Sequence, residues 1–143
     1  MKRCFEFLVQ GSLPPKKDGA NSMWGKPSER ERLIALRRAA LASLGTSKPL
    51  EADIRMFVEI HFPAEKILSS GDLDNFITGI CDGLMSASAG ALEFESWKTP
   101  ELAEIQPKRC IAIRDDREVM EISARKVISQ SGEPWYRVTL LGT

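Results

Sequence analysis

The segment from Asp53 to Phe62 constrains the fold of this chain more than any other. Its side chains alternate between apolar and mostly polar types, which is the period of a β-strand with one buried face. The apolar side chains that point one way are Ile54, Met56, Val58, Ile60 and Phe62. Pro63 ends the pattern. We therefore expect a sheet whose apolar face is covered by helices.

Two segments have the periodicity of such helices. Ser28 to Glu31 has the S-x-x-E spacing of a capping box and opens the first helix, which Gly45 ends. Its expected buried face is Leu33, Leu36, Ala40 and Leu44. The second helix covers Asp74 to Met85, with an apolar face made of Phe76, Ile77, Ile80, Cys81 and Leu84. The opposite, polar face carries Asn75, Thr78, Gly79 and Asp82.

Further short apolar segments predict the remaining strands. They are Cys4 to Val9, Cys110 to Ile113, Glu118 to Ile128 and Trp135 to Leu141, the last two joined by a turn at Gln130 to Glu133. Residues 10–27 form a long polar loop, and residues 86–109 are irregular and are expected to be an insertion. The whole chain, 1–143, is predicted to be one α/β (α+β) domain with a mixed β-sheet and helices packed on it.

Charge is distributed unevenly although the net charge is zero. Residues 1–48 carry ten Lys or Arg and four acidic residues, so their net charge is +6. The rest of the chain therefore has a net charge of −6. A basic part beside an acidic part suits a protein that binds a polyanion and holds cations elsewhere, but it is also compatible with an ordinary solvated surface. The chain has no apolar run of membrane-spanning length, no secretory leader at its start and no paired cysteines, so we expect a cytoplasmic protein.

Two pairs of aspartates are the strongest candidates for chemistry. Asp72 and Asp74 lie between a loop and a helix, and in extended backbone their side chains point to the same side. Two adjacent carboxylates repel unless a cation lies between them, and Mg²⁺ prefers oxygen ligands. Asp115 and Asp116 form a second pair at the end of a predicted strand. The alternative is structural, because aspartates often cap helices and stabilise turns.

These motifs have an order along the chain that resembles one nuclease family. Asp72-Leu73-Asp74-Asn75, followed by Asp82-Gly83-Leu84 on a helix, resembles the D-L-D-N…D-A-L stretch of RusA-type Holliday junction resolvases. Asp115-Asp116 with Val119 resembles the D-D-x-x-V of that family. Residues 11–15, Gly-Ser-Leu-Pro-Pro, are similar to its opening loop.

The resemblance implies a single RusA-like domain that acts as a homodimeric endonuclease on four-way DNA junctions with Mg²⁺ or Mn²⁺. By position, Asp72, Asp74 and Asp116 match its catalytic, metal-binding carboxylates, with Asp115 as a neighbouring metal ligand. The chain departs from the family at two places. Thr78 occupies a position where the family commonly has a Lys, and Gly71 one where it tends to have a basic residue. Lys66, Arg114, Arg117 and Lys126 are the candidates to replace that charge, and the sequence does not choose among them.

Basic side chains near the N-terminus are the candidate DNA contacts. Lys16, Lys17 and Lys26 lie in the long loop, with Trp24 either stacking on DNA or packing on its own domain. Arg30, with Arg37 and Arg38, either extends this surface or lies on a solvated helix face. Trp97 either anchors the 86–109 segment or lies at a dimer contact. Besides an endonuclease, two alternatives stay open. One is a protein that binds branched DNA without cleaving it, and the other is an unrelated α/β protein whose aspartates only cap helices and stabilise turns.

Overall fold

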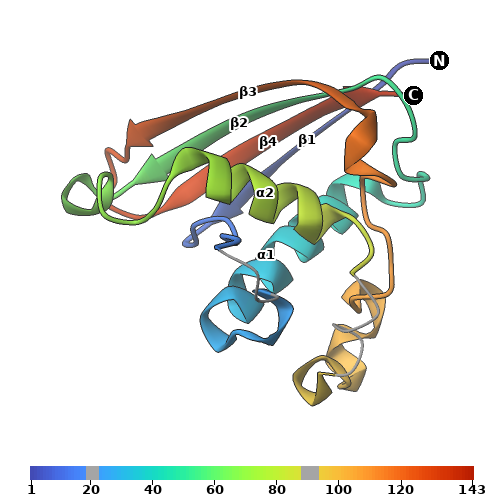
Figure 1. Cartoon of the computed structure of the whole chain (residues 1–143), viewed down its shortest axis with the longest axis horizontal. Helices are drawn as coiled ribbons and strands as arrows, with labels where there is room; N and C mark the ends of the chain where they lie inside the picture. The colour runs from blue at the N-terminus through green and yellow to red at the C-terminus, as the bar shows by residue number, and fades with distance from the viewer. Residues whose placement is uncertain (19–22, 88–93) are drawn as a thin grey trace.

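A computed structural model describes residues 1–18, 23–87 and 94–143. Its centre is a four-stranded mixed sheet in the order β1-β4-β2-β3. The strands are β1 (Arg3–Gln10), β2 (Ile54–Phe62), β3 (Val119–Ile128) and β4 (Trp135–Gly142). β4 is antiparallel to both of its neighbours, and β3 is parallel to β2. The helices α1 (Pro27–Leu44) and α2 (Leu73–Leu84) lie on one face of the sheet (Figure 1), as the α+β prediction requires.

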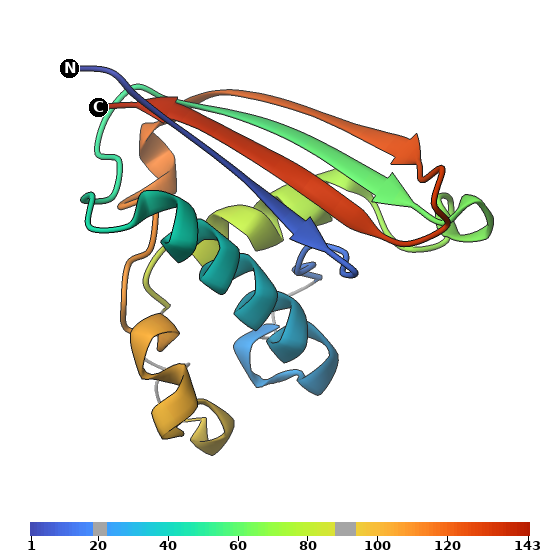
Figure 2. The same ribbon diagram turned by 180° about the vertical axis from the view of Figure 1, so that it is seen from behind.

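The main core lies between this face of the sheet and the two helices. All five apolar residues predicted on one side of β2 are buried, which confirms the alternation. The four predicted core positions of α1 are buried as well, and in α2 only Ile77 of the five is partly exposed. The opposite face of the sheet is covered by none of the described helices (Figure 2). None of the described helices is long and apolar enough to span a membrane.

The helix ends differ from the sequence prediction in one respect. α1 begins at Pro27 with Lys26 in the N-cap position, so Ser28 lies inside the helix and the predicted capping box is not formed. Pro27 fits the first helical position because its fixed φ is helical and a donor there has no partner within the helix. At the other end, Gly45 adopts φ +60° and ends the helix as predicted.

The sheet corrects two strand predictions. Residues 119–128 and 135–142 are strands, but they are not neighbours, because β2 lies between β3 and β4. β3 instead joins β2 in parallel, and such a pair needs a long crossover, which α2 and the 86–109 segment provide. Residues 110–113 do not form a strand. Ile113 makes only an isolated parallel bridge with Leu50.

The described parts of residues 86–109 form a second small core on the flank of α1. They include the 3₁₀ helices η4 (Glu95–Trp97) and η5 (Pro100–Ile105). The Trp97 side chain donates from Nε1 to the Trp24 carbonyl oxygen at 2.8 Å, and the two rings lie 5.2 Å apart. Trp97 therefore anchors this segment. The predicted loop and insertion each extend over residues outside the described part, at 19–22 and 88–93.

Candidate metal centre

Asp72 and Asp74 lie at the N-terminal end of α2 with exposed side chains. Asp72 has extended backbone in the N-cap position, whereas Asp74 lies within the first helical turn. The side chain of Asp72 makes no capping hydrogen bond, although the position favours one. The structural alternative for this pair is therefore not realised, and both carboxylates remain available to a ligand.

Asp115 and Asp116 lie near the other end of α2 and have different environments. The Asp115 carboxylate accepts hydrogen bonds of 2.7–3.1 Å from the Arg117 side chain and one of 2.9 Å from the Arg117 amide. These bonds hold the pKa of Asp115 down at about 2. The Asp116 side chain is exposed, and its backbone amide donates to Met85 Sδ at 3.1 Å. Asp115 therefore stabilises a turn, and Asp116 is the member of the pair that is open to a cation.

The two pairs are separated by the length of α2. Asp72 precedes its first residue, Asp116 contacts the residue that follows its last, and twelve helical residues span about 18 Å. Figure 1 shows α2 running along the sheet, with the loop after β2 at its N-terminal end and the orange segment that leads into β3 at the other. Within the described ranges, one copy of the chain brings together no group of three metal-binding side chains.

The first candidate DNA contacts, Lys16 and Lys17, lie along the outer side of α2. The Lys16 amine pairs with Asp18 at 3.3 Å, and the Lys17 amine pairs with Asp82 at 3.2 Å. Pro15 crosses Gly79 so closely that its carbonyl oxygen occupies the space of a side chain there. Gly79 is therefore buried and not part of an exposed polar face, contrary to the sequence prediction.

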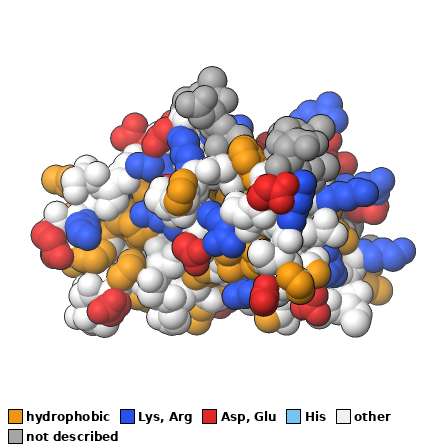
Figure 3. All heavy atoms as spheres, turned by 90° about the horizontal axis from the view of Figure 1, so that it is seen from below, with side chains coloured by type: hydrophobic (Ala, Val, Ile, Leu, Met, Phe, Trp, Pro, Cys, Tyr) orange, Lys and Arg blue, Asp and Glu red, His pale blue; other side chains and the backbone are white. Residues whose placement is uncertain are grey.

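The remaining candidates, Lys26 and Arg30, lie at the N-terminal end of α1. Arg30 donates from Nε and Nη2 to the Ser96 carbonyl oxygen at 3.1 and 2.9 Å, so it holds the 94–98 segment against α1. Lys26 lies at the N-cap of α1. Trp24 is buried and packs within its own domain, which is the second of the two alternatives that the sequence left open. On the face seen in Figure 3, Lys and Arg side chains are interspersed with Asp and Glu instead of forming one basic patch.

Among the basic residues left open by the sequence, Lys126 lies beside the first aspartate pair. Its amine donates to the carbonyl oxygens of Ile67 at 2.9 Å and Gly71 at 2.7 Å. Arg114 and Arg117 instead pair with Glu51 and Asp115. The sequence signal for Lys126 was weak, because only the parallel pairing of β3 with β2 brings this residue to the loop before Asp72.

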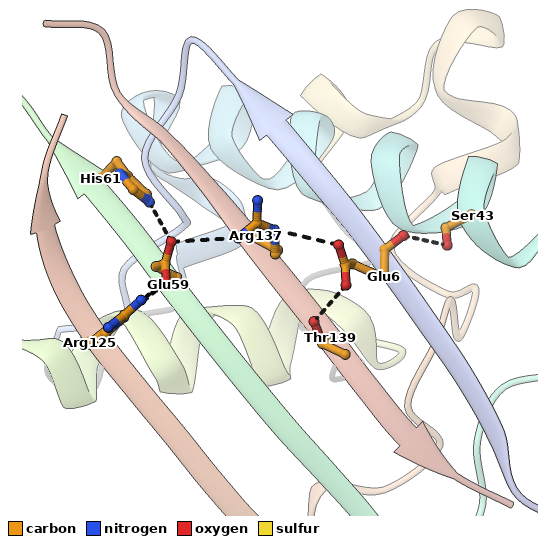
Figure 4. A network of polar contacts seen from close by, with 7 residues as sticks. All are labelled: Glu6, Ser43, Glu59, His61, Arg125, Arg137 and Thr139. Atoms are coloured by element: carbon orange, nitrogen blue, oxygen red, sulfur yellow. Dashed lines mark hydrogen bonds and ion pairs between the residues drawn. The ribbon is translucent and has the colours of Figure 1, made fainter. Parts of the chain in front are cut away.

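The open face of the sheet carries a polar network that sequence reasoning missed (Figure 4). Glu59 is at its centre, with hydrogen bonds to His61 at 2.7 Å and to the Arg125 guanidinium, and an ion pair with Arg137 at 3.6 Å. The Arg125 and His61 hydrogen bonds lower the pKa of Glu59. The His61 ring stacks on Trp135 with ring centres 3.7 Å apart. The network connects β3, β2 and β4, so it stabilises the sheet.

Glu59→Gln is expected to lower stability by about 1 kcal/mol at neutral pH, or about 3 °C in Tm. Because the pKa of Glu59 is lowered by folding, its contribution is complete above the pKa of the unfolded chain and is lost as the pH falls through the folded value. The difference in Tm between wild type and variant should therefore shrink from pH 7 to pH 3. Glu121→Gln is the control, since the one partner of Glu121 in residues 1–18, 23–87 and 94–143 is Arg55, in an exposed pair at 3.5 Å. A difference that does not change with pH would contradict the assignment.

No family model matches this chain, and no curated protein matches it.

Proposed function

We propose that this protein is a metal-dependent endonuclease that cleaves branched DNA, with the four-way junction as its substrate. The observation that carries the proposal is the set of exposed carboxylates on Asp72, Asp74 and Asp116, none of which pairs with another described side chain. Oxygen donors of this kind fit Mg²⁺ or Mn²⁺.

A second copy of the chain would complete the donor set. β3 is an edge strand of the sheet. Three of its large apolar residues are exposed: Met120 by 63%, Ile122 by 47% and Ile128 by 53%. Ile122 and Ile128 are opposite Met56 and Phe62 of β2, so they lie on the helix-covered face but beyond the cover of α2. An exposed apolar edge strand is a template for pairing with another strand. We assign it to a homodimer contact.

Two-fold pairing of β3 with its copy would be antiparallel and would place the start of one strand beside the end of the other. Asp116 lies just before the start of β3, and Lys126, near its end, contacts the loop that precedes Asp72. Such a dimer would therefore bring Asp72 and Asp74 of one copy toward Asp116 of the other. It would have two equivalent sites, as symmetric cleavage of a junction requires.

In each site, Asp72, Asp74 and Asp116 would hold the ion, which when bound supplies an activated water and neutralises charge on the phosphate. The chain itself holds the carboxylates at the N-terminal end of α2 and in the 3₁₀ turn that precedes β3. Asp115 would not be a ligand, because Arg117 occupies its oxygens, and its role would be to shape the turn that presents Asp116.

The proposal is tested with an end-labelled synthetic four-way junction and linear duplex in Mg²⁺. Wild type is expected to make paired symmetric nicks in the junction. Asp74→Asn and Asp116→Asn should each lose about 100-fold or more of the rate, because each removes a metal ligand. Asp53→Asn is the matched control, since among the described residues the Asp53 carboxylate pairs only with Lys2, at 3.8 Å. Equal rates for all four proteins would contradict the metal site.

A protein that binds junctions without cleaving them is the second candidate, and Thr78 favours it. This position carries no charge, and the Thr78 hydroxyl donates to the Asp74 carbonyl oxygen at 3.0 Å. Tight junction binding with no nicks in either Mg²⁺ or Mn²⁺ would support this second function over the first.

A further inference from the structure

The backbone just before Asp72 is held from one side by Lys126. Two of the three N–H groups of its ammonium donate to the carbonyl oxygens of Ile67 and Gly71. The amine also lies 5.2 Å from the centre of the Phe62 ring, and the residue is partly buried. Lys126 therefore ties the loop between β2 and α2 to β3.

Lys16, which lies in the N-terminal loop, contacts the same backbone segment before Asp72. Its amine donates to the Ser70 carbonyl oxygen at 3.1 Å and pairs with Asp18. Its own position is fixed, because its backbone amide donates to Glu29 Oε1 at 2.8 Å, and Glu29 is 7% exposed. The neighbouring Lys17 amide donates to the Asn75 carbonyl oxygen of α2.

The Lys16 side chain also occupies the space in which a side chain at position 71 would project. A Cβ on Gly71 would lie 2.6 Å from Lys16 Cδ and 3.2 Å from its Nζ. Gly71 itself has φ +141°, a conformation that other residues rarely adopt. The Lys16 ammonium thus lies at the Ser70-Gly71 backbone, and its side chain fills the space into which a side chain at position 71 would project.

We propose that Lys16 and Lys126 are positioning residues that clamp the Ser70-Gly71 backbone, aim the Asp72 carboxylate and place two positive charges at the N-terminal end of α2. The inference rests on the proposed nuclease function. Each ammonium has one N–H that is not used in the contacts above, so both can also face a phosphate oxygen. The two lysines therefore supply the charge that Gly71 and Thr78 do not.

The test compares wild type with Lys16→Met and Lys126→Met, which keep most of the apolar stem and remove the amine. Lys2→Met is the control, because within the described part of the chain the Lys2 amine makes only an exposed pair with Asp53. Two quantities are measured: the Mg²⁺ concentration that gives half of the maximal cleavage rate, and hydrogen exchange of residues 67–74 in EDTA. We expect the Mg²⁺ requirement to rise about tenfold and exchange to become faster in both variants, as for loss of a group that orients a metal ligand. Lys126→Arg should restore part of the Mg²⁺ affinity.

The two measurements separate failure of this inference from failure of the proposed function. A Mg²⁺ requirement and an exchange pattern equal to those of wild type would overturn the clamp, even if wild type cleaves junctions. If wild type does not cleave, the proposed function fails, and exchange in EDTA still decides on the clamp. Faster exchange in both lysine variants and not in Lys2→Met would then support it, and unchanged exchange would overturn it.

Discussion

Arg37→Met is expected to lower the free energy of unfolding by about 3–5 kcal/mol, a large part of the stability of a domain this size. Arg37 is fully buried. Its guanidinium donates to five backbone carbonyl oxygens, those of Gly83, Met85, Ile105, Gln106 and Arg109, at 2.5–3.0 Å. Burial lowers its pKa to about 9. A methionine fills part of the volume and leaves all five acceptors without this donor.

Urea unfolding of the wild type, Arg37→Met and Arg37→Lys measures the effect. Lysine has three donors and cannot reproduce the fork of a guanidinium, so Arg37→Lys should be intermediate. Arg38→Met is the control, because the neighbouring Arg38 is exposed on the same helix. A loss below about 1 kcal/mol for Arg37→Met would mean that the acceptors find water or other donors.

Arg37 also shows where sequence reasoning stopped. Helical periodicity places Arg37 on the surface of α1. The sequence therefore predicted either a contact with DNA phosphates or a solvated side chain, and both predictions are wrong because Arg37 is buried. The spacing of Leu36, Ala40 and Leu44 predicts the face of α1 that packs toward the sheet. Leu33, predicted on the same face, packs instead in the second core, which forms where residues 94–109 lie beside α1. Helical periodicity marks Leu33 as buried but does not show which part of the chain covers it.

The strands were easier to predict than their order. The alternation in β2 identifies a half-buried strand because each second side chain enters the core. The placement of β3 depends on which strand it joins after a crossover of more than fifty residues, and local periodicity does not contain that information. Its weak burial pattern, with Met120 and Ile122 exposed, has the same cause, since β3 is an edge strand.

The aspartates were found by their motifs, but their separation was not foreseen. Sequence spacing placed Asp72 beside Asp74 and left the distance to Asp116 open, and the structure puts a whole helix between them. It also distinguishes Asp115 from Asp116, because Arg117 binds only the first. That distinction depends on side-chain geometry at a short 3₁₀ turn, η6 (Asp116–Glu118), for which Asp115 is the N-cap. The sequence shows two adjacent aspartates and not which of them binds Arg117.

Mixing Asp74→Asn chains with Asp116→Asn chains is expected to restore junction cleavage, although each variant alone should lose about 100-fold or more of the rate. In the proposed dimer, a mixed pair has one site that carries both substitutions and one site that carries neither. Random exchange of subunits gives mixed dimers as half of the total, so about a quarter of all sites become intact. The physical reason is the length of α2, which keeps Asp74 and Asp116 of one copy apart and leaves the second copy to supply the missing carboxylate.

The measurement is the cleavage rate of the mixture after unfolding and refolding the two variants together, compared with each variant refolded alone. Mixed dimers should nick one strand of a junction and not both, because only one of their two sites is intact. Inactivity of the mixture, with wild type active after the same treatment, would contradict the shared site. Because complementation of this kind requires a site built from two chains, recovered single-strand nicking would establish the dimer and the metal ligands in one experiment.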